Sequence, residues 1–359
     1  MNILILAPYP PTIAPSQRFR FEQYLDFLEE AGHTYTYAPF IDLSTWNILH
    51  KPGHFIQKAF GIIKAFGRRK LLMLKAYQYD CVFLHREASH IGPPVFEWFL
   101  AKVLGKKIIY DFDDAIWLPN YSEHNARFHW LKWYHKVPFI IKWSHKVSAG
   151  NEYLAAYAKS FNSNVIINPT TIDTEGYHNP ILYPQKKNTK PIIGWTGTLT
   201  TSIYLKLLEP ILQDLEERYD FEFRVISNEA PDLKLKSMVF QPWKKETEIQ
   251  DLMQFDMGIM PLTEDKWAKG KCGFKALQYM ALGIPALVSP VGVNKEIVDH
   301  QENGFICCSP KDWEHRLVYL LENPEVLHQM GEKARKKIEE HYSVQSNKDN
   351  FLELMNSGQ

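Results

Sequence analysis

Residues 270–289 read GKCGFKALQYMALGIPALVS and combine two structural patterns. Gly273–Leu282 has apolar residues at helical spacing and predicts a helix. Ile284–Val288 is a short apolar run that predicts a buried strand. A helix that leads directly into a buried strand is typical of a parallel α/β sheet.

Two lysines, Lys271 and Lys275, fall at the start of this predicted helix. Cations are unfavourable at a helix N-terminus by a few tenths to about 1 kcal/mol, because the helix dipole is already positive there. An anion bound at that end removes the penalty. The position therefore indicates either an anion site or two solvated lysines.

The alternation of short apolar runs with helical patterns extends over the whole chain. The first half predicts a helix over Phe19–Ala31 and strands at Met1–Ala7, Asp80–Leu84, Lys107–Tyr110 and Val165–Ile167. The second half predicts helices over Ile203–Arg218 and His341–Met355 and strands at Pro191–Trp195, Phe221–Ile226 and Asp256–Met260. A polar segment with prolines and lysines separates the halves. We therefore expect two α/β domains, 1–168 and 191–341, joined by a linker over 169–190.

The composition is that of a soluble globular protein, with 45% hydrophobic and 23% charged residues. No apolar run approaches the ~20 residues of a membrane span, and the start of the chain lacks the pattern of a signal peptide. The four cysteines show no metal-ligand spacing and no disulfide framework. These features favour a reducing, cytoplasmic location.

The net charge of zero conceals two basic segments in the first half. Between Asp42 and Asp80 the chain has seven basic residues and no acid, and between Glu123 and Glu152 it has five. Within them, 54–77 and 127–146 interleave lysine or arginine with large apolar residues, as in helices that lie on anionic membranes. Ordinary packed helices, or a basic rim for a phosphorylated acceptor, are the alternatives.

Polar residues follow several strands of the first half, where parallel sheets bind ligands. Ser16, Arg18 and Arg20 follow the first strand, and His85, Arg86 and Glu87 follow the second. Asp111, Asp113 and Asp114 follow the third. Three carboxylates in four residues repel one another, which favours a functional site, strong cationic partners or a metal site over a passive loop.

The second half offers Gly194-Trp195-Thr196-Gly197-Thr198 at the end of its first strand. Neither half has the glycine-rich fingerprint of nicotinamide binding or the lysine loop of nucleotide hydrolases, so both activities lose their usual support. Trp195 fits a stacking role or core packing equally well.

These blocks resemble family 4 glycosyltransferases. The resemblance rests on Gly270–Ser289, on Gly292-Val-Asn294 with Glu296, on Asn303-Gly304-Phe305, and on YDFDDAIW at 110–117. It implies a GT-B fold of two Rossmann-like, doubly wound domains that face each other across a cleft. The last helix would return to the first domain, which adds 342–359 to 1–168. The resemblance further implies acceptor binding by the first domain, nucleotide-sugar binding by the second, and retention of configuration without an obligatory metal.

Carried over residue by residue, the family pattern is incomplete. The positions of its paired glutamates hold Gly270 and Gln278, so both acids are missing. Asp265 would contact the donor sugar in their place, Gln278 the ribose, and Asp113 the acceptor. Lys271 and Lys275 would then hold the diphosphate of the donor. The remaining donor-binding candidates are Arg18, Arg20, Thr196, Gly197, Thr198, Trp267, Gly273 and Asn294.

We therefore expect a retaining glycosyltransferase that uses a UDP-, GDP- or TDP-sugar, needs no cofactor and acts in cell-surface polysaccharide or glycolipid assembly. Its partners would be the donor, a glycan or lipid-linked acceptor and an anionic membrane surface, with no nucleic acid. A nucleotide-sugar epimerase or phosphorylase on the same fold is the enzymatic alternative. A non-catalytic glycosyltransferase-like subunit is the alternative that the missing glutamates motivate.

Overall fold

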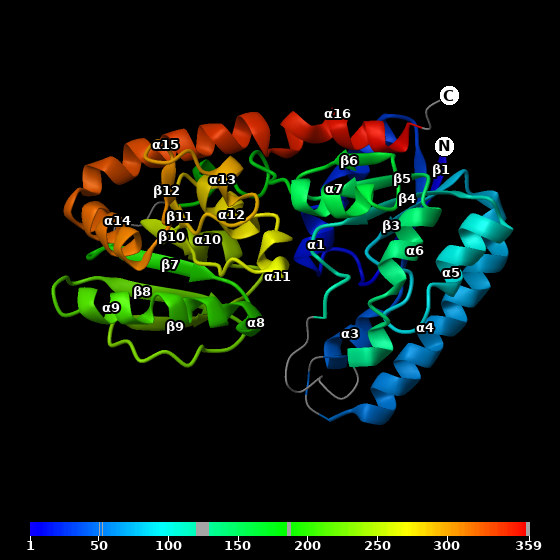
Figure 1. Ribbon diagram of the computed structural model, residues 1–359, viewed down its shortest axis with the longest axis horizontal. Coiled ribbons are helices and arrows are strands. Elements are labelled where there is room, and N and C mark those ends of the chain that lie inside the picture. Colours follow the sequence, from blue (N-terminus) through cyan, green and yellow to red (C-terminus); the bar gives the residue numbers. More distant parts are fainter. Residues whose placement is uncertain (50, 52, 120–128, 185–187, 357–359) are drawn as a thin grey trace. The chain divides into compact units, whose positions relative to one another are not determined.

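A computed structural model describes residues 1–49, 51, 53–119, 129–184 and 188–356 (Figure 1). The chain forms two compact units, one from Met1–Thr170 with Lys348–Gln359 and one from Thr171–Asn347. We call them unit 1 and unit 2. Arg127 in the second basic segment, residues 185–187 of the expected linker and the last three residues lie outside the described residues.

Unit 1 contains a six-stranded sheet in which all neighbouring strands are parallel. The strand order is β2-β1-β3-β4-β5-β6. The strands are β1 (Asn2–Ala7), β2 (Thr34–Pro39), β3 (Cys81–His85), β4 (Lys107–Phe112), β5 (Lys146–Ala149) and β6 (Val165–Ile167). The central strands are almost entirely buried, which requires helices on both faces of the sheet.

The helices of unit 1 lie between these strands. They are α1 (Pro15–Arg18), α2 (Leu25–Glu30), α3 (Leu43–Leu49), α4 (Phe55–Lys75), α5 (Val95–Trp98), α6 (Lys136–Trp143) and α7 (Glu152–Lys159). The single helix expected over Phe19–Ala31 is interrupted: α1 ends at Arg18, and a 3-10 turn over Glu22–Tyr24 precedes α2.

The helix α16 (Val344–Met355) ends in unit 1. Phe351 stacks on Tyr24, with ring centroids 4.4 Å apart. The Lys146 Nζ donates hydrogen bonds to the carbonyl oxygens of Glu353, Leu354 and Asn356 at the end of this helix. A cation at a helix C-terminus satisfies carbonyls that have no partner within the helix.

Unit 2 repeats the architecture with strand order β12-β11-β10-β7-β8-β9, again with parallel neighbours. Its strands are β7 (Ile192–Thr196), β8 (Glu222–Ser227), β9 (Met238–Pro242), β10 (Met257–Met260), β11 (Ala286–Val288) and β12 (Gly304–Ile306). Its helices are α8 (Leu199–Ser202), α9 (Glu209–Leu215), α10 (Glu248–Leu252), α11 (Lys266–Lys269), α12 (Phe274–Ala281), α13 (Asn294–Ile297), α14 (Pro310–Glu322) and α15 (Pro324–His341).

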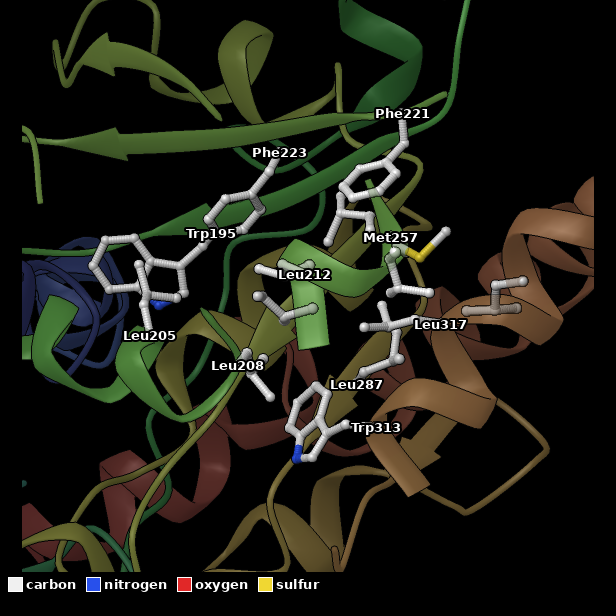
Figure 2. Packing of buried hydrophobic residues seen from close by; sticks show 14 of the residues in the cluster. Trp195, Leu205, Leu208, Leu212, Phe221, Phe223, Met257, Leu287, Trp313 and Leu317 are labelled. Atoms are coloured by element: carbon white, nitrogen blue, oxygen red, sulfur yellow. The ribbon is translucent and has the colours of Figure 1, made fainter. Parts of the chain in front are cut away.

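One face of the unit 2 sheet packs on α9 and α14 (Figure 2). Trp195 from β7 is 1% exposed and lies in this cluster with Leu205, Leu212, Phe223 and Trp313. Trp195 is thus a core residue. The helix expected over Ile203–Arg218 is interrupted at Leu208, because Pro210 lacks an N–H and fits only in the first turn of a new helix, α9.

Both units are Rossmann-like, with parallel sheets whose carboxyl edges carry the loops that are candidates for ligand binding. Among the residues that the structure describes, no helix is long and apolar enough to cross a bilayer.

Candidate functional site

The carboxyl ends of β3, β4 and β5 bring three polar side chains together in the interior of unit 1, where Arg20 joins them. His85 is in register with Asp111, and Asp111 with Ser148. Asp111 accepts hydrogen bonds from the Ser148 hydroxyl, at 2.6 Å, and from the Arg20 guanidinium, and its Oδ2 lies 2.7 Å from His85 Nδ1. Arg20 also donates to the carbonyl oxygen of Asn168. All these side chains are buried.

This network holds Asp111 as a carboxylate. Burial alone would raise its pKa, but the charge of Arg20 and the hydrogen bond from His85 more than offset that effect and lower the pKa well below its usual value. Arg20 is therefore committed to a carboxylate inside unit 1, although the sequence placed it among the donor-binding candidates. The residue pattern indicated strong cationic partners for these acids, but it did not single out Arg20, which is 91 residues from Asp111.

Asp113 and Asp114 share a second arginine. Arg86 Nη2 lies 2.6 Å from the Asp113 Oδ1 and 2.7 Å from the Asp114 Oδ2. Arg86 is in the left-handed backbone region, with φ of 59°, which directs the chain from β3 toward the loop after β4. Burial would lower the pKa of Arg86, but the two carboxylates raise it.

The three aspartates of this loop therefore have arginine partners, which explains how they tolerate one another. Within the described part of the chain, no three histidine, cysteine or acidic side chains gather as a metal-binding cluster. Arginine accounts for the acidic cluster without a metal ion.

Two groups that were not among the predicted residues, Lys136 and His90, interact with Glu87. Glu87 Oε2 lies 2.8 Å from Lys136 Nζ, and Lys136 is 3% exposed. Burial lowers the pKa of His90 to about 4, against a raising effect of Glu87, so this imidazole is neutral at physiological pH. His90 also stacks on Phe40. Glu87 was among the sequence candidates, but nothing in the sequence pointed to His90.

In unit 2, the start of α12 holds the two lysines. Gly273 is the residue before the helix and has φ of +68°, in the left-handed region that favours glycine. An added Cβ there would lie 2.1 Å from the Ile297 Cδ1, so the site also needs the absence of a side chain. Gly273 thus sets the angle at which the chain enters α12.

Each lysine lies over an indole ring. The Lys271 Nζ is 5.8 Å from the centroid of the Trp267 ring, and the Lys275 Nζ is 5.6 Å from that of Trp195. A cation over an aromatic face gains about 0.5–1 kcal/mol at an exposed site, and more when it is desolvated. The rings therefore hold both ammonium groups near the start of the helix.

Asp265 is the N-cap residue of α11, the short helix that precedes the two lysines. Its Oδ1 accepts hydrogen bonds from the backbone N–H groups of Trp267 and Ala268, both at 2.8 Å. Burial would raise the pKa of Asp265, but hydrogen bonds from Thr263 and from these two N–H groups lower it, and the charge of Lys271 adds to them. Asp265 is thus an anion that acts on the same lysine as Trp267.

The loop after β7 uses its own backbone donors. The N–H of Thr196 donates to the Tyr279 hydroxyl, that of Gly197 to the Ile226 carbonyl oxygen, and that of Thr198 to the Thr201 Oγ1. All three N–H groups expected to hold a diphosphate therefore have acceptors within unit 2. The register of β7 with β8 explains the Gly197 bond and the cap of α8 explains the Thr198 bond, so the lysines are the stronger candidates.

Gln278 points into a polar interior. Its Nε2 lies 3.3 Å from the His178 Nε2 and 3.5 Å from the Glu248 Oε1. Glu248 in turn accepts hydrogen bonds from the Tyr177 hydroxyl and the Trp243 indole N–H. Gln278 is 2% exposed, so its amide, expected on a ribose, is instead part of this network. Glu248 is a buried acid that sequence reasoning did not single out.

The remaining candidates are placed by local contacts. Asn294 begins α13 and donates from its Nδ2 to the Ser289 carbonyl oxygen at 3.1 Å, and its Oδ1 lies near Gly273. Arg18 ends α1 in unit 1, with its guanidinium carbon 4.9 Å from the Phe19 ring centroid. Asp113, Arg18 and Arg20 thus belong to unit 1, and the other candidates belong to unit 2.

Comparisons with known proteins agree with this architecture. The whole chain is similar in fold to a glycosyltransferase from Rickettsia africae, with a TM-score of 0.71, 15% identity and 99% of both chains covered. It is similar to Anabaena HepE, solved with UDP-glucose, with a TM-score of 0.66, 12% identity and 100% of both chains covered. Two Rossmann-like units with these neighbours define the GT-B fold.

The sequence of unit 2 is similar to that of a known family. Residues 187–337 match the family described as Glycosyl transferases group 1. An 86-residue segment is 29% identical to trehalose synthase of Pyrococcus horikoshii, which is 24% of this chain and only a fifth of that enzyme, 20%. The family match thus covers most of unit 2, and the likeness of the whole chain to solved structures is one of fold.

Proposed function

We propose that this protein transfers a sugar from a nucleoside diphosphate sugar to an acceptor hydroxyl, with retention of configuration. We further propose that the product is a cell-surface polysaccharide or a glycolipid. The match of residues 187–337 to the group 1 glycosyltransferases supports the reaction class. The acceptor class rests on the basic and apolar surface of unit 1 described below.

The observation that carries the proposal is the cationic start of α12. Lys271 and Lys275 stand where the helix dipole is positive, and Trp267 and Trp195 hold their ammonium groups there. The helix dipole disfavours cations at this end, and a bound anion would offset that cost. A diphosphate supplies two neighbouring negative groups, which match two lysines four residues apart.

The chemistry needed is departure of a nucleoside diphosphate from the anomeric carbon. Negative charge grows on the leaving phosphate while the sugar gains oxocarbenium character, so fixed positive charge lowers the barrier. In this proposal Lys271 and Lys275 stabilise the leaving group, and Asp265 contacts the donor sugar. Removal of one such lysine would cost on the order of 2–4 kcal/mol of barrier.

Asp113 is proposed to act on the acceptor from unit 1. Its carboxylate is 12% exposed and paired with Arg86, an arrangement that fixes its position. A retaining reaction on one face of the sugar lets the departing phosphate take the acceptor proton. Asp113 would therefore orient the hydroxyl, and a strongly basic group is not required.

Calorimetry with UDP, GDP and TDP tests the donor site. Lys271→Ala and Lys275→Ala should each weaken binding of the preferred nucleotide by about tenfold or more, which corresponds to 1.4 kcal/mol per factor of ten. Lys311→Ala is a matched control, because Lys311 also lies in the first turn of a helix, α14, beside Asp312. Unchanged affinity in both lysine variants would refute the assignment.

Product analysis with a labelled donor separates the enzymatic alternatives. A transferase moves the label to an acceptor, an epimerase changes the donor without one, and a phosphorylase needs inorganic phosphate. Absence of binding to every nucleoside diphosphate would instead favour the non-catalytic subunit. That alternative has some support in Gly270 and Gln278, which replace both family glutamates.

A further inference from the structure

The outer face of α4 carries a stripe of large apolar side chains. Ile56, Phe60, Ile63, Leu71 and Leu74 are between 65% and 86% exposed. Spaced by three, four or eight residues, they fall within an arc of about 80° on an ideal helix. We call these five residues the α4 stripe.

The opposite face of α4 is already used by the core of unit 1. Gly61, Ala65, Arg69 and Met73, each four residues apart, are buried. Ala65 packs with Phe40 and Ile41, and Gly61 approaches Thr45 of α3. The α4 stripe therefore does not contribute to the packing of α4 on unit 1. An exposed apolar stripe of this kind lowers solubility unless a partner covers it.

Basic residues border the stripe on both sides. On the same helical projection, Lys70 lies at one edge, and Lys64 and Lys75 lie at the other. Lys64 pairs with Asp42 at 3.3 Å. Lys70 and Lys75 form no ion pair with any residue in the described ranges. The whole stretch from 43 to 79 contains no acid, so the face is both apolar and cationic.

The second basic segment is organised differently. Its helix α6 buries Val137, Ile140 and Ile141 against unit 1, and Lys136 is paired with Glu87. Lys146 is bonded to the end of α16. Two of its five basic residues are thus structural, and its helix is an ordinary packed one. The second segment exposes Trp130, Trp133 and Phe139, but these described residues do not lie along one helix as the α4 stripe does.

We propose that the α4 stripe docks unit 1 on a bilayer that contains anionic lipid. Apolar side chains bordered by lysines match the acyl region of a membrane and its anionic headgroups. Protein interfaces instead deplete lysine. A symmetric contact between two copies would also oppose like charges. Docking on a bilayer would bring the enzyme to a lipid-linked acceptor. The acceptor class rests on the proposed function, whereas the docking itself does not.

Vesicle co-sedimentation without donor or acceptor tests the surface independently of catalysis. Binding to phosphatidylglycerol-containing vesicles should exceed binding to pure phosphatidylcholine vesicles and weaken as salt is added. The double variant Phe60→Gln/Leu71→Gln should bind at least about tenfold more weakly, because two apolar side chains no longer enter the bilayer. Lys70→Gln/Lys75→Gln should reduce the preference for anionic vesicles and the salt dependence.

Ile203→Gln/Leu207→Gln provides the matched control, because these exposed apolar residues lie on unit 2 and should leave vesicle binding unchanged. Circular dichroism checks that each variant is folded. Equal binding of wild type and the α4 variant, or no preference for anionic vesicles, would overturn the proposal. So would a lipid-free dimer, seen by sedimentation velocity, that the α4 variant abolishes. Loss of transferase activity with intact vesicle binding would count against the proposed function alone.

Discussion

Arg20 and Asp111 form an ion pair whose two side chains are completely buried. The pair joins the chain after β1 to the end of β4, and His85 and Ser148 complete the partners of the carboxylate. A buried pair of this kind is costly to form, but the loss of one partner leaves an uncompensated charge inside the protein. The pair thus couples the stability of unit 1 to the geometry of the loop that carries Asp113.

Asp111→Asn should therefore destabilise unit 1 by about 3–5 kcal/mol, because Arg20 then stays buried without a counter-charge. Urea unfolding gives the loss, and hydrogen exchange of the β3 and β4 amides assigns it to this unit. Lys64→Gln, which removes a surface pair, should cost about 1 kcal/mol or less. Equal losses in the two variants would contradict the role given to the buried pair.

The same pair predicts a dependence on pH. Because the folded-state pKa of Asp111 lies below its unfolded value of about 4, its contribution is present above that pH and is lost as the pH falls toward the folded pKa. The difference in unfolding free energy between wild type and Asp111→Asn should narrow on acidification below pH ~4. Urea titrations at several pH values measure it, and a constant difference would argue against the ion pair.

The sequence identified the two sheets through their apolar runs, and Val165–Ile167 has the predicted bounds. Two of the strands that the sequence analysis missed, β2 and β5, lack the short apolar run that predicted the others. In β2 three of the six residues are tyrosine or proline and none is fully buried, because β2 lies at the edge of the sheet. β5 begins with Lys146, which reads as a surface residue until its bonds to α16 are seen.

The candidate site was predictable where chemistry and position coincide in a short segment. Lys271, Lys275 and Asp265 lie within one loop and helix start, so their proximity follows from the sequence. The partners of Arg20 and Gln278 come from distant parts of the chain, and only the fold brings them together. A residue pattern predicts the element on which a side chain lies. It does not predict which distant residue that side chain will pair with.

Gly273→Ala tests whether the start of α12 needs glycine. The left-handed backbone costs an alanine roughly 1–2 kcal/mol, and the contact with Ile297 adds the cost of overpacking. We expect lower thermal stability and weaker nucleotide binding. Gly67→Ala is the control, because nothing lies within 4 Å of a Cβ added there in α4. It should raise stability by about 0.5–1 kcal/mol; a similar loss in both variants would exclude a special role for Gly273.

Gln278 stands where family 4 glycosyltransferases have a glutamate. In Gln278→Glu, a second carboxylate would lie close to the buried Glu248 Oε1, which is 3.5 Å from the Gln278 Nε2. Two such carboxylates cannot both ionise at low cost, so one pKa rises. A folded-state pKa above the unfolded value means that the variant loses stability, relative to wild type, as the pH rises above about 4. Thermal unfolding at pH 5 and pH 8 measures the effect.

Glu248→Gln/Gln278→Glu keeps one carboxylate in the pair and moves it to position 278. It should recover most of the stability that the single variant loses at pH 8, because the like charges are gone and the introduced amide can accept from the Trp243 indole N–H while its NH2 donates to the Tyr177 hydroxyl. Failure to recover would show that the loss comes from packing and not from charge. Recovery would explain the missing family acid physically: this chain places its buried carboxylate on α10, and the neighbouring position on α12 must then be neutral.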